Sequence, residues 1–309
     1  MSDIVNILLI IISLCLNAVT LEFLINQVPG CSSFITMAQF FFLALYGFIF
    51  GTKCGTTKRK IPFWDHLILV FFFFVGKACS SYVHDFNIPM TLVLIFKAGS
   101  ISENMMIGAL VKGRRYSLRK YLAVILITIG IIMSTLASAK EQSGDGAEES
   151  NSKIAMGVGL LVLSFIISSC KSVYNDSVQK QHGKHPLESL FYQNALSLLI
   201  FALMEGNIIN HFSQFNQSLP MILPVLGVSV PCFCLCLALN VITQIVGVHA
   251  LIVLDAKYDS LTCKVVTVSR TFISLVLSIY LFSVVFTATQ WLATGLVFGG
   301  TLLYCSTWM

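Results

Sequence analysis

The sequence predicts an all-α membrane protein whose chain crosses the bilayer ten times, as two inverted repeats of five transmembrane helices. Three observations indicate this fold: the composition, the spacing of apolar segments and a motif that recurs near the end of each half. The 309 residues are 56% hydrophobic and only 11% charged, whereas soluble proteins carry about 25% charged residues. A composition this apolar leaves no soluble domain of useful size and is typical of a polytopic membrane protein.

Ten apolar segments have the length that a helix needs to cross a bilayer. They occupy residues 4–25, 33–52, 62–84, 88–111, 120–139, 154–178, 187–209, 220–247, 259–282 and 287–307. The first segment lacks a small-residue cleavage site, so we expect a span rather than a removed signal peptide. The polar, acidic and Gly/Ser-rich stretch 140–153 is expected to be a flexible loop between a first repeat at 1–139 and a second at 154–309.

Lysine and arginine concentrate in alternate connections between the predicted spans. Basic residues follow the second, fourth and sixth spans: Lys53, Lys58, Arg59, Lys60, Lys112, Arg114, Arg115, Arg119, Lys120, Lys180 and Lys184. The connections after the third and fifth spans are poor in basic residues. By the positive-inside rule, we expect the basic connections and both termini in the cytosol, and loop 140–153 in the lumen. The sequon Asn216-Gln217-Ser218 then falls on the lumenal side.

A short motif recurs at the last span of each half. Residues 116–123 read YSLRKYLA and residues 286–293 read FTATQWLA, and a glycine follows at the same offset, Gly130 and Gly300. An odd number of spans in each half makes two such copies inverted in the membrane. Inverted repeats are typical of transporters, with the substrate site near the bilayer midplane.

Apart from Lys120, at the first position of one span, five of the nineteen lysine and arginine residues fall inside predicted spans. Lys77, Lys171 and Lys264 lie nearer span ends, where snorkelling of the side chain to the interface explains them. Lys97 and Arg270 lie deeper. A cation at the bilayer centre costs roughly 2.5–3.5 kcal/mol, so these two residues predict a polar environment inside the protein.

Each deep cation has polar neighbours at helical spacing. Ser100 and Asn104 follow Lys97 by three and seven residues. Around Arg270 runs a hydroxyl stripe formed by Thr267, Thr271, Ser274 and Ser278. One interpretation is a cavity that binds an anion, since a diphosphate would neutralise both cations. The alternative is internal ion pairing, for example with Glu22 or Glu103.

The stretch FYQN at residues 191–194 is a second candidate feature. It offers two aromatic faces, Phe191 and Tyr192, and two amides, Gln193 and Asn194. Rings can stack on a nucleobase and amides can bind its polar edge. The same residue types also serve as packing and as contacts between transmembrane helices, so both interpretations stay open.

Motifs of other function classes are absent from the sequence. No HExxH, GxSxG, P-loop or dinucleotide-binding motif occurs, which argues against an enzyme. The densest cysteine cluster, PCFCLC, has no metal-ligand spacing and is expected to pack within a helix. The histidines lie mostly at loops and span ends and are expected at the interface. We expect no cofactor, no metal and no nucleic-acid partner.

Several stretches together resemble the nucleotide-sugar transporters of the drug/metabolite transporter superfamily, in the branch of UDP-N-acetylglucosamine and UDP-xylose carriers. The stretches are LEFLINQVPGCSSFITMAQF (21–40), FNIPMTLVLIFKAGSISENM (86–105), VYNDSVQKQHGKHPLESLFYQNALSL (173–198), NVITQIVGVHAL (240–251) and SLTCKVVTVSRTFISL (260–275). The resemblance implies a ten-span protein of the Golgi or endoplasmic reticulum that exchanges cytosolic UDP-sugar for lumenal UMP by alternating access. The expected partners are UDP-sugar, UMP and the lipid bilayer, with a homodimer as one option. A different nucleotide or organic anion as substrate, a non-transporting role and an enzyme acting on a lipid-linked phosphate remain as alternatives.

The resemblance also implies roles for single residues. Lys97 and Arg270 stand at basic positions that would bind phosphate, Tyr192 and Asn194 fall in the nucleotide-linked motif, and Glu22 matches an acidic cavity position. The predicted substrate-binding set is Glu22, Lys97, Ser100, Asn104, Tyr192, Gln193, Asn194, Arg270, Thr271 and Ser274. Thr271 departs from the pattern because the family usually has a second basic residue there. Thr91 and Val93 also replace residues common in the branch, so the choice of sugar stays open.

Overall fold

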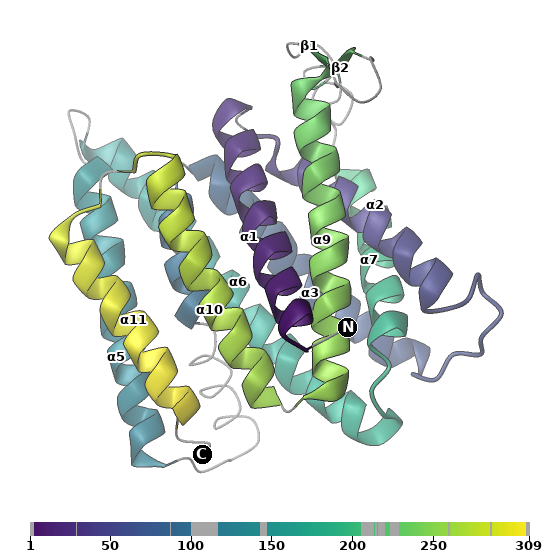
Figure 1. Cartoon of the computed structure of the whole chain (residues 1–309). Coiled ribbons are helices and arrows are strands. Elements are labelled where there is room, and N and C mark those ends of the chain that lie inside the picture. Colours follow the sequence, from purple (N-terminus) through teal and green to yellow (C-terminus); the bar gives the residue numbers. More distant parts are fainter. Residues whose placement is uncertain are drawn as a thin grey trace. The chain divides into compact units, whose positions relative to one another are not determined.

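The computed structural model is helical, apart from one small hairpin, in the part of the chain that it describes (Figure 1). It describes residues 3–28, 30–86, 88–99, 117–142, 147–204, 213, 215, 220–222, 229–258, 260–284 and 286–306. Helices α1, α2 and α3 span Asp3–Gln27, Ser32–Phe50 and Phe63–Tyr82, followed by a 3₁₀ turn η1 at Val83–Phe86 and a short helix Met90–Gly99. The later elements are α5 (Leu118–Gln142), α6 (Ala147–His182), α7 (Pro186–Met204), β1 (Pro220–Ile222), β2 (Ser229–Pro231), α9 (Cys232–Lys257), α10 (Ser260–Leu281) and α11 (Ala288–Ser306).

Six of the described helices are long and apolar enough to cross a membrane. They are Ile4–Gln27, Ser32–Phe50, Phe63–Tyr82, Leu118–Ser138, Ala155–His182 and Cys232–Lys257. Two shorter apolar helices are Met90–Gly99 and Val265–Leu281. The prediction of a helical polytopic membrane protein is therefore confirmed, while the number of ten spans stays a prediction. Of the predicted span 88–111, residues 100–111 lie outside the described part.

The predicted span 220–247 was placed wrongly. Helix α9 begins only at Cys232 and continues to Lys257, and the residues before it include an antiparallel hairpin that pairs Pro220 with Pro231. Proline lacks the amide hydrogen that a helix interior needs, and it clashes with the preceding turn. Pro220 and Pro231 therefore favour the hairpin and the later start of α9 over a helix that begins at residue 220, despite the hydropathy.

The stretch 140–153, expected as a flexible loop, is also different where it is described. Helix α5 continues to Gln142, and α6 begins at Ala147 and includes residues 147–153. Alanine and glutamate favour helix, and both residue types occur in this stretch. The side on which this stretch lies stays a prediction.

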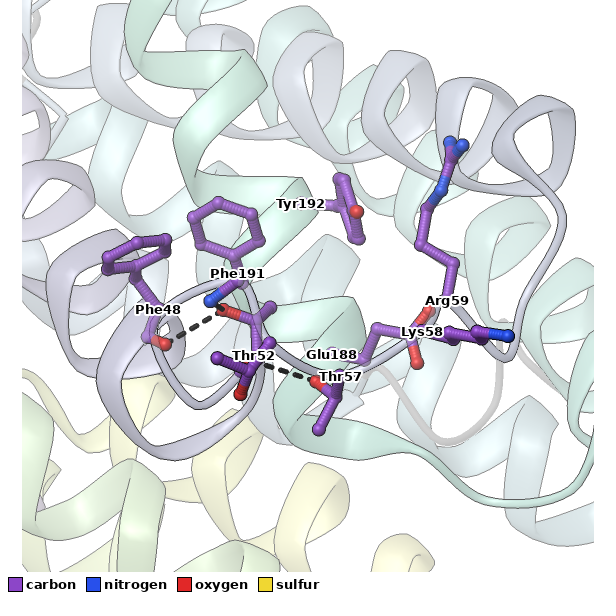
Figure 2. A pocket seen from close by; sticks show the side chains of 10 residues that line it. Phe48, Thr52, Thr57, Lys58, Arg59, Glu188, Phe191 and Tyr192 are labelled. Atoms are coloured by element: carbon purple, nitrogen blue, oxygen red, sulfur yellow. Dashed lines mark hydrogen bonds between the residues drawn. The ribbon is translucent and has the colours of Figure 1, made fainter.

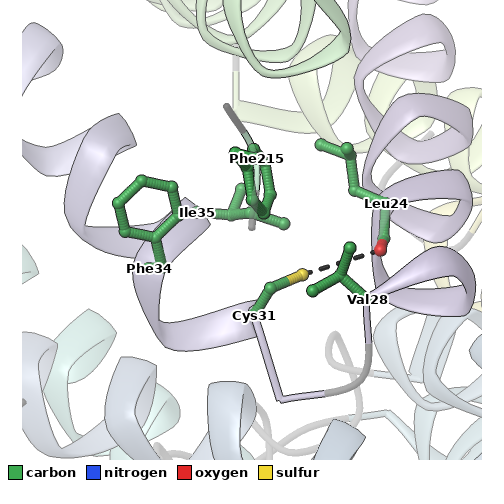
Figure 3. Close-up of a cluster of buried hydrophobic side chains, with 6 residues drawn as sticks. All are labelled: Leu24, Val28, Cys31, Phe34, Ile35 and Phe215. Carbon is green, nitrogen blue, oxygen red and sulfur yellow. Dashed lines mark hydrogen bonds between the residues drawn. The ribbon is translucent and has the colours of Figure 1, made fainter. Parts of the chain in front are cut away.

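The chain divides into two compact units, and each is described by itself. Unit 1 comprises Met1–His66 and His185–Ile252, and unit 2 comprises Leu67–Lys184 and Val253–Met309. Each unit thus combines segments from both of the predicted five-helix halves. In unit 1, a cluster of buried side chains covers the turn between α1 and α2, formed by Leu24, Val28, Cys31, Phe34, Ile35 and Phe215 (Figure 3).

Helices α1, α2 and α9 of unit 1 are joined by a hydrogen-bond network around Asn240. The amide of Gln39 donates to Asn240 Oδ1 over 2.7 Å, and Asn240 Nδ2 donates to Thr20 Oγ1 over 3.0 Å. Asn17 and Asn240 each donate a side-chain N–H to the backbone oxygen of the other, over 2.8 and 2.9 Å. Buried polar groups in a membrane protein must find internal partners, and this network provides them.

In unit 2, α5 and α11 pack against each other through glycines (Figure 1). A Cβ added at Gly130 would lie 2.7 Å from Ala293 O, and one added at Gly300 would lie 3.0 Å from Ala123 O. Gly130 also meets Val297, and Gly300 also meets Ile127. Gly130 meets residues of α11 that precede Gly300, and Gly300 meets residues of α5 that precede Gly130. The two helices are therefore antiparallel. The glycines therefore allow two backbones to approach closely.

Candidate anion-binding site

A cavity of about 460 Å³ in unit 2 brings three lysines together. Lys77 comes from α3, Lys97 from the short helix Met90–Gly99 and Lys171 from α6. The remaining wall is formed by small, hydroxyl and aromatic side chains of α3 and α6: Phe72, Phe73, Gly76, Ser80, Ser164, Phe165, Ser168, Ser172 and Asn175. The cavity therefore combines a positive lining with hydroxyl and amide groups, which is the chemistry of an anion-binding site.

Lys97 is positioned by a helix that is otherwise apolar on every side. Every other residue of Met90–Gly99 is buried, and Lys97 alone in this helix is half-buried. A helix that is hydrophobic all round belongs inside a protein, and the accessible part of Lys97 faces the cavity. The prediction that Lys97 lines a cavity therefore agrees with the geometry. Ser100, Asn104 and Glu103 lie outside the described residues.

Lys77 and Lys171 were interpreted from sequence as snorkelling residues, but both line the same cavity as Lys97. The charge of Lys77 acts on those of Lys97 and Lys171. Lys171 Nζ also lies 4.3 Å from the ring centroid of Phe73, a cation–π contact. Since α6 continues to His182 rather than ending near 178, Lys171 lies farther from the helix end than the sequence indicated.

Hydroxyl groups connect the two long helices beside these lysines. Ser164 Oγ donates to the backbone oxygen of Gly76 over 2.8 Å, which joins α6 to α3. Ser168 Oγ donates to Ser164 O within α6, over 2.8 Å, and lies 3.2 Å from the position that a Cβ on Gly76 would take. Small residues at these positions let the helices approach and leave room for the long lysine side chains.

Arg270, the other deep cation, belongs to the same unit as Lys97, and the charges of the two residues interact. A terminal guanidinium nitrogen of Arg270 lies 3.5 Å from Thr271 Oγ1, whose hydroxyl donates to Thr267 O over 2.9 Å. Thr271, Ser274 and Ser278 are 1–2% exposed, so three members of the predicted hydroxyl stripe face the interior. Thr267 is exposed and does not belong to that buried face.

A second cavity, of about 600 Å³, lies in unit 1 and includes Tyr192 (Figure 2). The rings of Phe48, Phe191 and Tyr192 lie toward one side of it, and Lys58 and Arg59 lie toward the other. Close packing of α2 on α7 positions these rings, because a Cβ at Gly47 would lie 2.9 Å from the Phe191 backbone. An aromatic wall facing two cations suits a planar, anionic ligand.

Glu188 fixes the basic loop and α7 around this second cavity. Its carboxylate accepts hydrogen bonds from the backbone amides of Lys60 and Ile61, over 3.1 and 3.3 Å, and lies 3.2 Å from His66 Nε2. The ring of His66 stacks on Tyr192 with centroids 4.3 Å apart. His66 is 0% exposed, while the interpretation of the histidines as lying near the membrane interface stays a prediction. Glu188, the partner of His66, explains how the ring is buried.

The other predicted residues of unit 1 are buried. Glu22 on α1 is 6% exposed, Gln193 is 9% exposed and Asn194 is 1% exposed. Asn194 Nδ2 donates to Leu190 O over 2.7 Å, while Asn194 Oδ1 is one of the few buried side-chain atoms in the described residues without a hydrogen-bond partner. The predicted set is thus divided by unit: Glu22, Tyr192, Gln193 and Asn194 in unit 1, and Lys97, Arg270, Thr271 and Ser274 in unit 2.

Among the described residues, no group of His, Cys, Asp and Glu side chains could hold a metal ion. Long apolar helices, glycine-mediated helix contacts and cations gathered on internal cavities define a polytopic membrane protein of the transporter class. Comparison with known proteins identifies the family. The chain belongs to the UAA transporter family, which it matches over residues 2–308, and it is a transporter rather than an enzyme.

Relatives align with almost the whole chain. A Danio rerio protein named "UDP-xylose and UDP-N-acetylglucosamine transporter" is 39% identical over 310 residues, which cover 98% of this chain and 94% of the relative. A Drosophila melanogaster "Endoplasmic reticulum GDP-fucose transporter" is 38% identical, covering 97% and 89%. The Homo sapiens "Nucleotide sugar transporter SLC35B4" is 35% identical, covering 95% and 91%. The resemblance to nucleotide-sugar transporters is confirmed.

Proposed function

We propose that the protein carries a UDP-sugar, UDP-N-acetylglucosamine or UDP-xylose, from the cytosol into the lumen of the Golgi or endoplasmic reticulum in exchange for UMP. The observation that carries this proposal is the cavity lined by Lys77, Lys97 and Lys171, in a chain whose Danio rerio relative is named for these two substrates. The positive-inside pattern of the loops supports a cytosolic position for both termini.

The charge of the two exchanged molecules supports one shared phosphate site. Like charges that interact inside a protein disfavour one another, and Lys97 interacts with both Lys77 and Arg270. A phosphate monoester such as that of UMP carries roughly 1.5–2 negative charges near pH 7. The diphosphate of a nucleotide sugar carries a comparable charge, so either molecule would relieve the repulsion.

For the nucleobase, unit 1 offers the residues of FYQN. Tyr192 lines a cavity, where its ring would stack on a base. Asn194 holds a buried amide oxygen without a hydrogen-bond partner, which would accept an N–H of the uracil ring. We therefore assign Tyr192 and Asn194 to contact with the base.

Two inverted repeats and ten spans remain our proposal for the architecture, and the contact between α5 and α11 supports it. Ala123, Ile127 and Gly130 of α5 have counterparts in α11 at one constant sequence offset, namely Ala293, Val297 and Gly300. Gly130 packs on Ala293 and Val297, and Gly300 packs on their counterparts Ala123 and Ile127. A reciprocal contact of this kind is what a two-fold axis generates, and the antiparallel direction fits an axis in the membrane plane.

The positive charge of the phosphate site supports coupled exchange. Desolvating a charge is unfavourable unless an opposite charge accompanies it. Bound phosphate would therefore favour the occluded state, so that each change of access carries one nucleotide across the membrane in exchange for another.

Purified protein in liposomes tests the proposal directly. Vesicles loaded with UMP and empty vesicles receive radiolabelled UDP-N-acetylglucosamine, UDP-xylose or GDP-fucose, the last because of the Drosophila melanogaster relative. We expect uptake of a UDP-sugar at least tenfold faster into UMP-loaded vesicles. Equal uptake into empty vesicles would refute exchange. Uptake of GDP-fucose alone would refute the proposal that uracil is the recognised nucleobase. Thermal stabilisation by nucleotides without any uptake would favour the non-transporting alternative.

A further inference from the structure

We propose that Lys77 and Lys171, on α3 and α6, are phosphate ligands that act together with Lys97 as a three-lysine subsite for the diphosphate. This inference rests on the proposed function and names the residues that receive its phosphates. Neither lysine belongs to the basic positions that the sequence indicated, Lys97 and Arg270.

Two helix faces of matching composition build the subsite. On α3, Gly76, Lys77 and Ser80 line the cavity within little more than one turn. On α6, the lining positions Ser164, Ser168, Lys171 and Asn175 follow one another by four, three and four residues, which keeps them on one face. The hydrogen bond from Ser164 to Gly76 O holds the two faces together. A polar stripe this regular on two apolar helices indicates a ligand surface rather than lipid contact.

The arrangement of charge selects the ligand. Lys77, Lys97 and Lys171 come from three different helices and line one cavity. A ligand with two adjacent negative groups can neutralise such a cluster, whereas a neutral nucleoside cannot. Lysine carries its charge on a flexible stem, so the same three side chains can adapt to a diphosphate and to a monophosphate. Phe73 supports Lys171 through its ring face, 4.3 Å from Nζ.

The removal of one lysine has an expected signature that distinguishes ligand binding from support of the fold. Lys77→Met keeps a long, flexible side chain and removes a cation that repels its neighbours. The variant is therefore expected to be at least as stable as the wild-type protein without ligand. If the lysine supported the fold, its replacement would lower the stability of the ligand-free protein.

The experiment uses full-length protein in detergent and follows thermal unfolding with inorganic pyrophosphate, UMP and uridine as probes. Wild-type protein should be stabilised by pyrophosphate and UMP but not by uridine. Lys77→Met and Lys171→Met should each raise the half-saturating pyrophosphate concentration at least tenfold, without lowering the unfolding temperature of the ligand-free protein. Lys180→Met, an exposed position on the same helix α6, is the matched control and should behave as wild type.

Two outcomes separate this inference from the proposed function. If wild-type protein exchanges UDP-sugar while both methionine variants keep the wild-type half-saturating pyrophosphate concentration, the three-lysine subsite is wrong and the transport function stands. If pyrophosphate stabilises the protein through Lys77 and Lys171 but no UDP-sugar is exchanged in liposomes, the subsite stands and the proposed function fails. Stabilisation by uridine, which carries no charge, equal to the stabilisation by UMP would also overturn the subsite.

Discussion

Replacing Glu188 with alanine removes the acceptor that joins the basic loop, α3 and α7 in unit 1. Two backbone amides, of Lys60 and Ile61, and the ring nitrogen of His66 lose their partner at once. The side chains of His66 and Glu188 are 0% and 11% exposed, so water does not readily replace the carboxylate. The Glu188→Ala variant therefore leaves buried polar groups without partners, which is the costly way to lose a hydrogen bond.

The magnitude follows from the burial of this pair. Leaving one buried donor without its acceptor costs about 1–3 kcal/mol, and because the three bonds share one carboxylate we expect a total of about 3–5 kcal/mol rather than three full penalties. At about 2–3 °C per kcal/mol for a chain of this size, the unfolding temperature should fall by roughly 6–15 °C. Glu188→Gln retains an oxygen acceptor and should lose about 1–3 kcal/mol.

Thermal unfolding of the purified variants in one detergent measures these shifts. Asp255→Ala is the control, because its ion pair with Lys184 spans 3.3 Å but the two side chains are 46% and 57% exposed. An exposed pair contributes about 0–1 kcal/mol, so the control should shift the unfolding temperature little. If Glu188→Ala and Asp255→Ala shift it equally, the described role of Glu188 in holding the loop is wrong.

Three further variants test other parts of the structure. Gly130→Val should cost about 1–3 kcal/mol of stability, because its Cβ would lie 2.7 Å from Ala293 O. Thermal unfolding measures this loss. The control Gly295→Ala, whose Cβ would have nothing within 4 Å, should not lower stability. Asn240→Leu should lower stability by about 0.6–1.7 kcal/mol for each interhelical hydrogen bond lost, and unchanged unfolding would contradict the network. Arg270→Ala should fold and insert, yet lose exchange of labelled UDP-sugar in liposomes; wild-type exchange would refute its role.

The depth of a cation in the membrane could be predicted from the sequence. The helix face from which its side chain extends could not be predicted in every case. Lys97 was assigned to a cavity because a deep charge is costly, and it lines one. Lys77 and Lys171 were judged by their distance from span ends, which says nothing of the helix face. The stripe of Ser164, Ser168, Lys171 and Asn175 was visible in the sequence as helical spacing and would have identified the face.

Other features had no local signal. Glu188 and His66 are 122 residues apart in the chain, so their pairing depends on how α3 and α7 meet. The two compact units combine segments from both halves of the chain, and hydropathy alone cannot predict which helices gather together. By contrast, the start of α9 at Cys232 was predictable from the prolines before it.

Polar residues inside this protein fall into two physical classes, and the difference carries the functional assignment. Asn240 donates to two partners and accepts from others, so its burial is compensated within the fold. Lys77, Lys97 and Lys171 line a common cavity beside hydroxyl and amide groups. Like charges held together lower the stability of the ligand-free protein. Under the proposed three-lysine subsite, substitution of Lys77 or Lys171 should spare stability and impair phosphate binding.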